Sequence, residues 1–170
     1  DALLRRAHVL AVKNKFIDEI INFIRGNIDP EIVRIEMVNI EDESRFYVHS
    51  NMFDESIDIT KYGEGVQRIF EIALLFGYCQ NGILCIDEFE SAIHAGLLKE
   101  FSRFVQQLAE RFNVQVFLST HSKECIDAFI DNEYKNEEIT GYTLKEKKDG
   151  TIECKYVDGL RLESLIESIN

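Results

Sequence analysis

Two short, unbroken apolar runs stand in the middle of the chain, and each ends in polar residues. The first run, residues 83–86, leads directly into Asp87 and Glu88, and the second, residues 114–118, leads into a Ser-Thr-His sequence that ends at His121. A short apolar run without polar alternation is typical of a strand buried on both faces, as in the middle of a parallel sheet. The pattern therefore predicts two buried strands that end in reactive side chains.

The segment between these strands has the periodicity of a helix. Its apolar residues recur at spacings of three and four between residues 95 and 112. A strand, a helix and a second strand make a right-handed crossover, in which the strands are parallel. Ligands bind beyond the carboxyl ends of such strands. We therefore expect Asp87, Glu88 and His121 to lie together at one edge of the sheet.

The N-terminal part of the chain divides into a helical segment and short strands. Residues 1–27 carry an apolar stripe at helical spacing, which predicts one helix within the segment 1–30, ended by Gly26 and Pro30. In the segment 31–60 apolar and polar residues alternate. This alternation predicts three short, half-buried strands, at 33–39, 45–49 and 55–59.

The C-terminal part contains further short elements. We predict a helix over 123–130 and then, within the segment 131–170, a hairpin and a last helix. The hairpin strands are 139–145 and 151–157, joined at an Asp-Gly pair that strongly favours a turn. The last helix is expected over 160–169.

A glycine-rich sequence, Y-G-E-G-V-Q-R, occupies residues 62–68 and precedes a helical stretch at 69–78. The glycines Gly63 and Gly65, on either side of Glu64, permit a tight turn and a close backbone approach to another group. The helix that follows offers free N–H groups to an anion. A glycine pair before a helix is also common in ordinary turns, so this feature gains meaning only beside the others.

Taken in order, these motifs resemble the C-terminal half of an ATP-binding-cassette (ABC) ATPase. Within that superfamily they look most like AAA-type ATPases related to the overcoming-lysogenization-defect proteins and to SMC-like heads. Residues 62–68 match the signature loop, 83–88 the Walker B strand, 90–94 the D-loop and 119–122 the switch-histidine loop. The usual signature, LSGGQ, has serine where this chain has Gly63. The resemblance implies an α/β fold, the C-terminal lobe of a P-loop NTPase head, with a parallel core sheet in segment 61–130 and short antiparallel strands.

The resemblance also implies roles and partners. Asp87 would hold Mg²⁺, Glu88 would polarise the attacking water, and His121 would contact the γ-phosphate of ATP. Gly63, Glu64 and Gly65 would meet the nucleotide of a second head, so that two heads form a homodimer through ATP. Such ATPases drive effectors, commonly nucleases or toxins that act on nucleic acid in phage defence or DNA repair.

One expected motif does not occur in the 170 residues. A phosphate-binding loop has the form G-x-x-x-x-G-K-[ST] and cradles the β and γ phosphates. No such string is present. We therefore expect residues 1–170 to be the C-terminal part of one split or truncated ATPase domain, without the Walker A part.

Composition bears on partners and on location. The chain has 31 acidic and 19 basic residues, for a formal net charge of −12. An acidic surface argues against this part binding a nucleic-acid backbone, which requires clustered Lys and Arg. The four cysteines show no C-x-x-C spacing, and Cys85 falls in a predicted buried strand. Reduced thiols, no signal peptide and no long apolar run predict a cytoplasmic protein without a membrane segment.

Two other functions are consistent with these residues. A non-catalytic interaction module that retains the ATPase fold is favoured by Gly63 in the signature and by the missing phosphate loop. The Asp87–Glu88 pair and His121 argue against it. A metal-dependent nuclease could use Asp87, Glu88 and Glu90, because alternate residues share a face if the strand continues to Glu90.

Overall fold

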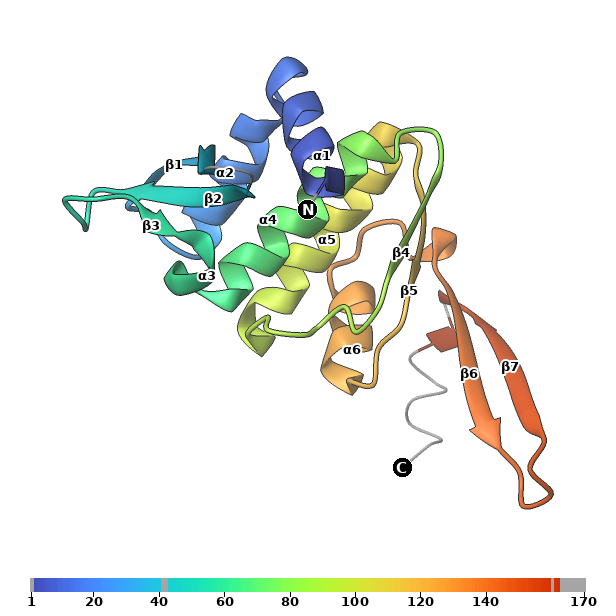
Figure 1. Cartoon of the computed structure of the whole chain (residues 1–170). Coiled ribbons are helices and arrows are strands. Elements are labelled where there is room, and N and C mark those ends of the chain that lie inside the picture. Colours follow the sequence, from blue (N-terminus) through green and yellow to red (C-terminus); the bar gives the residue numbers. More distant parts are fainter. Residues whose placement is uncertain (1, 41–42, 160, 163–170) are drawn as a thin grey trace.

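The computed structural model describes residues 2–40, 43–159 and 161–162. Long helices lie at the centre, with an antiparallel sheet on one side and a parallel strand pair on the other (Figure 1). A two-stranded hairpin extends beyond the parallel strands. The central helices are α1 (Ala2–Lys13), α2 (Ile17–Asn27), α4 (Glu64–Tyr78) and α5 (Ala95–Phe112). This α/β arrangement agrees with the predicted fold class.

The N-terminal segment forms two helices, whereas the sequence pattern predicted one. The chain turns between α1 and α2, where Lys15 has a left-handed φ of 57°. The N–H of Phe16 donates to the carbonyl of Ala11 at 2.8 Å, which closes the end of α1 as in a Schellman motif. The turn places Phe16 in the core, fully buried and edge-on to Phe112. Burial of this ring explains the break, which has no glycine to signal it.

The antiparallel sheet has the order β1–β2–β3 and confirms the three predicted strands. They are β1 (Ile32–Ile40), β2 (Glu43–Ser50) and β3 (Ile57–Asp58). His49 lies 2.9 Å from the Glu36 carboxylate and 2.9 Å from the Ser56 hydroxyl. These contacts give His49 a structural place in the sheet.

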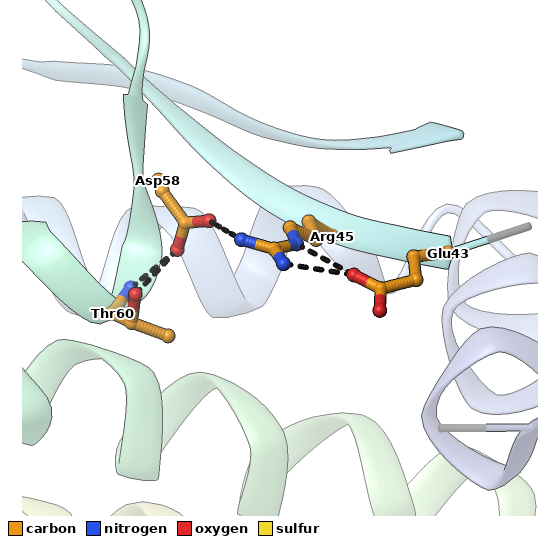
Figure 2. A network of polar contacts seen from close by, with 4 residues as sticks. All are labelled: Glu43, Arg45, Asp58 and Thr60. Carbon is orange, nitrogen blue, oxygen red and sulfur yellow. Dashed lines mark hydrogen bonds and ion pairs between the residues drawn. The ribbon is translucent and has the colours of Figure 1, made fainter. Parts of the chain in front are cut away.

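A polar network joins this sheet to the short helix α3 (Ile59–Tyr62), which leads into the glycine-rich sequence (Figure 2). Asp58 is buried and caps α3, since its carboxylate accepts from the Thr60 N–H at 2.9 Å and from the Thr60 hydroxyl at 2.7 Å. Arg45 lies 3.6 Å from the other Asp58 oxygen and also binds Glu43. The Thr60 hydroxyl, with help from the Thr60 N–H and from Arg45, holds the pKa of Asp58 below its ordinary value.

We expect Asp58→Ala to lower the free energy of unfolding by about 1–2 kcal/mol at neutral pH, because it removes a helix cap. The folded-state pKa of Asp58 is depressed, so this stabilisation is full above the ordinary value of 3.8. It should disappear as the pH falls through the lower folded-state pKa. Urea titrations at several pH values measure both effects. Glu43→Ala, which breaks only an exposed ion pair, is the control and should leave stability unchanged within error.

Helix α4 forms much of the core and connects the glycine-rich sequence to the parallel strands. It begins at Glu64, five residues earlier than predicted, so Gly65 lies inside its first turn. Strand β4 (Ile83–Ile86) pairs in parallel with β5 (Gln115–Leu118), and α5 is the crossover between them. The predicted strand–helix–strand unit is confirmed.

The prediction that these strands are buried on both faces is wrong for the part of the chain that the structure describes. Leu84 and Ile86 face the core, whereas Ile83 is 59% exposed and Cys85 is also exposed. On β5, Phe117 is 50% exposed. The two strands form a sheet by themselves, so the helices cover only one face. An apolar surface of Ile83, Cys85 and Phe117, here called the open face, remains uncovered.

The C-terminal elements follow the prediction as far as the structure describes them. Helix α6 (Lys123–Asp131) packs on α5, and a 3-10 turn, η1 (Asn136–Glu138), precedes the hairpin of β6 (Thr140–Glu146) and β7 (Ile152–Asp158). The turn glycine, Gly150, has a φ of 81°. The helix predicted over 160–169 falls almost entirely outside the described residues. No helix in the described ranges is long and apolar enough to cross a membrane.

Candidate functional site

The loops after β4 and β5 are joined by backbone hydrogen bonds at the carboxyl ends of the strands. The Ser119 N–H donates to the Ile86 carbonyl at 3.0 Å, and the Phe89 N–H donates to the Ser119 carbonyl at 3.0 Å. Phe89 is fully buried and stacks on Phe101 with ring centroids 5.1 Å apart. The buried ring anchors the loop between β4 and α5, residues 87–94, here called the acidic loop. The residues on either side of Phe89 are therefore held at the sheet edge.

Ser119 binds the two residues that the sequence singled out. Its hydroxyl donates to one Asp87 carboxylate oxygen and accepts the Glu88 N–H at 3.0 Å. Both acidic side chains are exposed. Glu88 has a φ of 45°, in the left-handed region, which is uncommon for a residue other than glycine. Such outliers persist where surrounding contacts impose them, and they cluster at functional sites.

Glu90 links the acidic loop to the loop after β5, residues 119–122. One of its carboxylate oxygens accepts the His121 N–H at 3.1 Å, while the other is buried without a hydrogen-bond partner in the described structure. Burial opposes ionisation of Glu90, but hydrogen bonds from its own backbone N–H, from Thr120 and from the His121 N–H outweigh it and hold its pKa below the usual range. His121 is exposed beside Glu90. The structure therefore brings His121 to the edge that carries Asp87 and Glu88, as predicted.

The same geometry bears on the nuclease hypothesis. That hypothesis required the strand to continue so that Glu88 and Glu90 share a face. Strand β4 ends at Ile86, and the chain then turns through the positive φ of Glu88. Within the described residues, no group of three or more His, Cys, Asp or Glu side chains is placed to hold a metal ion. The continuous-strand ligand set is not present.

The glycine-rich sequence reaches the same edge through α4. Gly63 caps α4 with an extended backbone, and a Cβ built on Gly63 would meet nothing within 4 Å. Gly65 is different, because a Cβ there would lie 2.8 Å from the Ala92 carbonyl oxygen. Glu64 is exposed in the first turn of α4. Gly65 therefore serves a close approach to the acidic loop of its own chain, while Gly63 faces open space.

Arg68, one turn further along α4, binds the backbone of the acidic loop directly. Its Nη2 donates to the Asp87 carbonyl at 2.6 Å and to the Glu88 carbonyl at 3.2 Å. Nearby, His94 caps α5 by accepting the Gly96 N–H at 3.1 Å on its Nδ1. His94 thus has a structural role as the cap of α5.

The hard oxygen ligands at this edge fit Mg²⁺. Mg²⁺ is usually bound by one or two carboxylates together with waters and substrate phosphates. Asp87 offers an exposed carboxylate, held by the Ser119 hydroxyl, and both residues line a shallow hollow together with residues of β4 and β5. One protein carboxylate of this kind suits a metal ion that arrives with a nucleotide.

The fold is that of an ABC/AAA-type ATPase head. It combines the parallel crossover with the acidic loop, the loop that carries His121 and the helix that Gly63 caps. The chain belongs to the family described as "AAA domain, putative AbiEii toxin, Type IV TA system", whose model matches residues 3–127. It is 39% identical over 88 residues to the uncharacterised protein MJECL11 of Methanocaldococcus jannaschii, covering 52% of this chain and 76% of that protein. These findings confirm the family resemblance.

Solved structures of SMC heads share the fold. A structure from work on ATP-driven dimerisation and DNA-stimulated activation of SMC ATPases matches with a TM-score of 0.57 at 11% identity, over 94% of this chain and 96% of that one. A Smc head bound to the C-terminal winged-helix domain of ScpA gives 0.56 at 12%, over 92% of this chain and 48% of that one. The Pyrococcus furiosus Smc head with an extended coiled coil gives 0.56 at 12%, over 90% and 37% respectively.

Sequence reasoning did not predict the contacts of three residues that the structure places at the site, although the nuclease hypothesis had named Glu90 as a metal ligand. Ser119 lay in the motif but was not recognised as the group that binds both Asp87 and Glu88. Glu90 and Arg68 were also within motifs, yet their backbone partners are about 20 to 30 residues away in sequence. Arg68 did leave a signal, since it is the one cation of α4, a helix whose other residues are apolar, acidic or neutral.

Proposed function

We propose that this chain supplies the signature, Walker B and switch-histidine parts of a head that binds and hydrolyses ATP. Membership of an AAA family indicates nucleotide binding and hydrolysis in general. The observation that carries the specific proposal is the convergence of four motifs on one sheet edge through Ser119, Glu90 and Arg68. Motifs far apart in sequence gain a common chemistry only when they meet in this way.

In this proposal each residue acts through a definite property. Mg²⁺ bound with the nucleotide would neutralise charge on the phosphates. Asp87, oriented by the Ser119 hydroxyl, would hold the ion, and the exposed Glu88 carboxylate would accept a proton from the attacking water. His121, held through its N–H by Glu90, would reach the γ-phosphate. Gly63–Gly65 and the start of α4 would face the nucleotide of a second head.

The phosphate loop would come from additional polypeptide, either preceding these residues or in a separate chain. Two observations support this. Two of the three matched SMC structures are much longer, since this chain spans only 48% and 37% of them, whereas it spans 96% of the other. The open face of Ile83, Cys85 and Phe117 is apolar and uncovered, whereas parallel sheets are usually covered on both faces. We propose that the polypeptide with the phosphate loop packs on the open face.

Two such heads would dimerise around ATP, by analogy with the ATP-driven dimerisation described for the SMC ATPases that share this fold. The dimer would drive an effector, for which a nuclease or a toxin is our proposal. The net charge of −12 favours nucleic-acid contact by the effector over contact by this acidic part.

We expect the isolated 170-residue chain to bind Mg-ATP weakly, because it contains no phosphate cradle. Isothermal titration calorimetry at millimolar nucleotide measures this directly. The complete head, titrated alongside, should bind at least about tenfold more tightly, which corresponds to about 1.4 kcal/mol. Micromolar binding of Mg-ATP by the isolated chain would contradict the proposal that the cradle lies elsewhere.

A second candidate function is a non-catalytic interaction module with the same fold. Gly63, where the usual signature has serine, favours it, because glycine has no hydroxyl to offer a phosphate. The ATPase rate of the complete protein separates the two functions. A module without catalysis should bind ATP and dimerise, yet show no hydrolysis that depends on Glu88.

A further inference from the structure

Arg68 makes its contacts with the backbone of Asp87 and Glu88, not with their carboxylates. One guanidinium nitrogen bridges the two successive carbonyls at 2.6 and 3.2 Å. The Nε of the same side chain is buried and makes no hydrogen bond in the described structure. A buried donor without a partner is costly, so the two carbonyl contacts must outweigh it for this rotamer to persist. The guanidinium is thus committed to the acidic loop.

These contacts bear on the unusual backbone of Glu88. Its N–H is bound by the Ser119 hydroxyl, and its carbonyl accepts from Arg68 at 3.2 Å and from the Ser91 N–H at 2.9 Å, so both peptide groups of the residue are fixed. A residue other than glycine at a φ of 45° needs such support, since ordinary conformations are lower in energy. Loss of Arg68 would free the Asp87 carbonyl, which it binds at 2.6 Å in the peptide that precedes Glu88. The backbone of Glu88 could then relax, and the direction of its carboxylate would change with it.

Arg68 also connects Glu88 to the glycine-rich sequence. It lies one turn after Glu64 in α4, the helix that Gly63 caps. The same helix touches the far side of the acidic loop, where Gly65 approaches the Ala92 carbonyl. Because a helix moves as a rigid element, a shift at its glycine-capped start would be carried to the carbonyls of Asp87 and Glu88.

We propose that Arg68 is a positioning residue that sets the direction of Glu88 in its own head according to what the start of α4 binds. The inference rests on the proposed ATPase function and deepens it. A nucleotide of the second head, bound at Gly63–Gly65, would thereby control hydrolysis at the site that contains this Glu88. The two nucleotides of the dimer are then linked through one side chain in each head.

The substitution Arg68→Ala in the complete head tests this positioning role. Its kcat for ATP should fall about tenfold to a hundredfold, because a small misplacement of a reacting group costs about that much. The KM should change by less than about threefold, since Arg68 touches no nucleotide in this scheme. Arg68→Lys should recover part of kcat, because an ammonium can still donate to both carbonyls. Millimolar guanidinium should also raise the rate of Arg68→Ala.

Arg25 provides a matched control. Its Nε and Nη2 bind the successive carbonyls of Ile32 and Val33 at 2.8 and 2.9 Å, far from the acidic loop in the sequence. Arg25→Ala should lower the free energy of unfolding, because it removes local support of the backbone. It should leave kcat within about twofold of the wild-type value. Equal losses of kcat in Arg25→Ala and Arg68→Ala, or an unchanged kcat in Arg68→Ala, would overturn the proposal.

Mixing two variants shows where Arg68 acts. Arg68→Ala and Glu88→Gln should not complement each other, because each substitution would damage the hydrolytic side of the head that carries it. Neither of the two sites in a mixed dimer would then be intact. Recovery to about a quarter of the wild-type rate would instead place the action of Arg68 in the second head, and would contradict the proposal. If Glu88→Gln alone retains full activity, Glu88 is not the general base, which is a separate result from a failure of Arg68.

Discussion

Replacing Glu88 with glutamine is expected to lower the rate of ATP hydrolysis by the complete head by about 10²- to 10⁴-fold, the range for loss of a general base. Glutamine keeps the shape of the side chain and removes the proton acceptor. Glu88 is exposed at the sheet edge, so the substitution should leave folding intact. Nucleotide binding should survive, and the ATP-bound dimer should persist because the step that ends it is blocked.

Steady-state hydrolysis, equilibrium nucleotide binding and size-exclusion chromatography with ATP test the three parts of this expectation. Glu100→Gln is the matched control, since Glu100 is an exposed glutamate of α5 and the change removes the same charge. It should hydrolyse ATP at the wild-type rate. Hydrolysis by Glu88→Gln at a near wild-type rate would show that the general base lies elsewhere, and would leave the acidic loop with a metal-binding role at most.

Much of this site could be predicted because its parts are local in sequence. A run of four apolar residues that ends in Asp87 and Glu88 fixes a strand and its functional end, and the periodicity of 95–112 fixes the crossover. The parallel pairing followed from these two facts and is confirmed by the register of β4 with β5. Topology alone then brought His121 to the same edge.

The contacts that hold the site together could not be predicted in the same way. Ser119, Glu90 and Arg68 act on backbone groups, and any residue offers the same N–H and carbonyl. The pattern of side chains in a sequence therefore does not predict which backbone group a polar side chain will bind. Cys85 was predicted to be buried and is exposed. Apolar residues on both faces of a strand do not show whether this chain itself covers both faces. The break at Phe16 likewise depended on tertiary packing.

The structure makes Gly63, and not Gly65, the position at which to test whether sites are shared between heads. A side chain at Gly65 would press on the Ala92 carbonyl of its own acidic loop, so any loss of activity could arise within one head. Gly63 has an extended backbone with a φ of 161° and open space beyond it. An arginine there can be accommodated by the head that carries it, yet would block a nucleotide that approaches from a second head.

Gly63→Arg should therefore abolish ATP-driven dimerisation and hydrolysis, with a loss of hydrolysis of at least about a hundredfold, while the head still binds ATP. Gly26→Arg is the control, because a Cβ at Gly26 also meets nothing within 4 Å and the residue lies near the end of α2. It should leave the rate unchanged. Light scattering with ATP and a coupled hydrolysis assay measure both properties.

Mixing gives the decisive result. Gly63→Arg damages the signature side of a shared site and Glu88→Gln damages the hydrolytic side. A dimer of one head of each kind should contain one intact site, built from Glu88 of the first head and Gly63 of the second. Equal mixing makes at most about half of the dimers mixed, and each mixed dimer has one intact site of two. The rate should therefore return to at most about a quarter of the wild-type value. Full activity of Gly63→Arg alone, at every protein concentration, would mean that the glycine-rich sequence only caps α4 and that each head hydrolyses ATP without a partner.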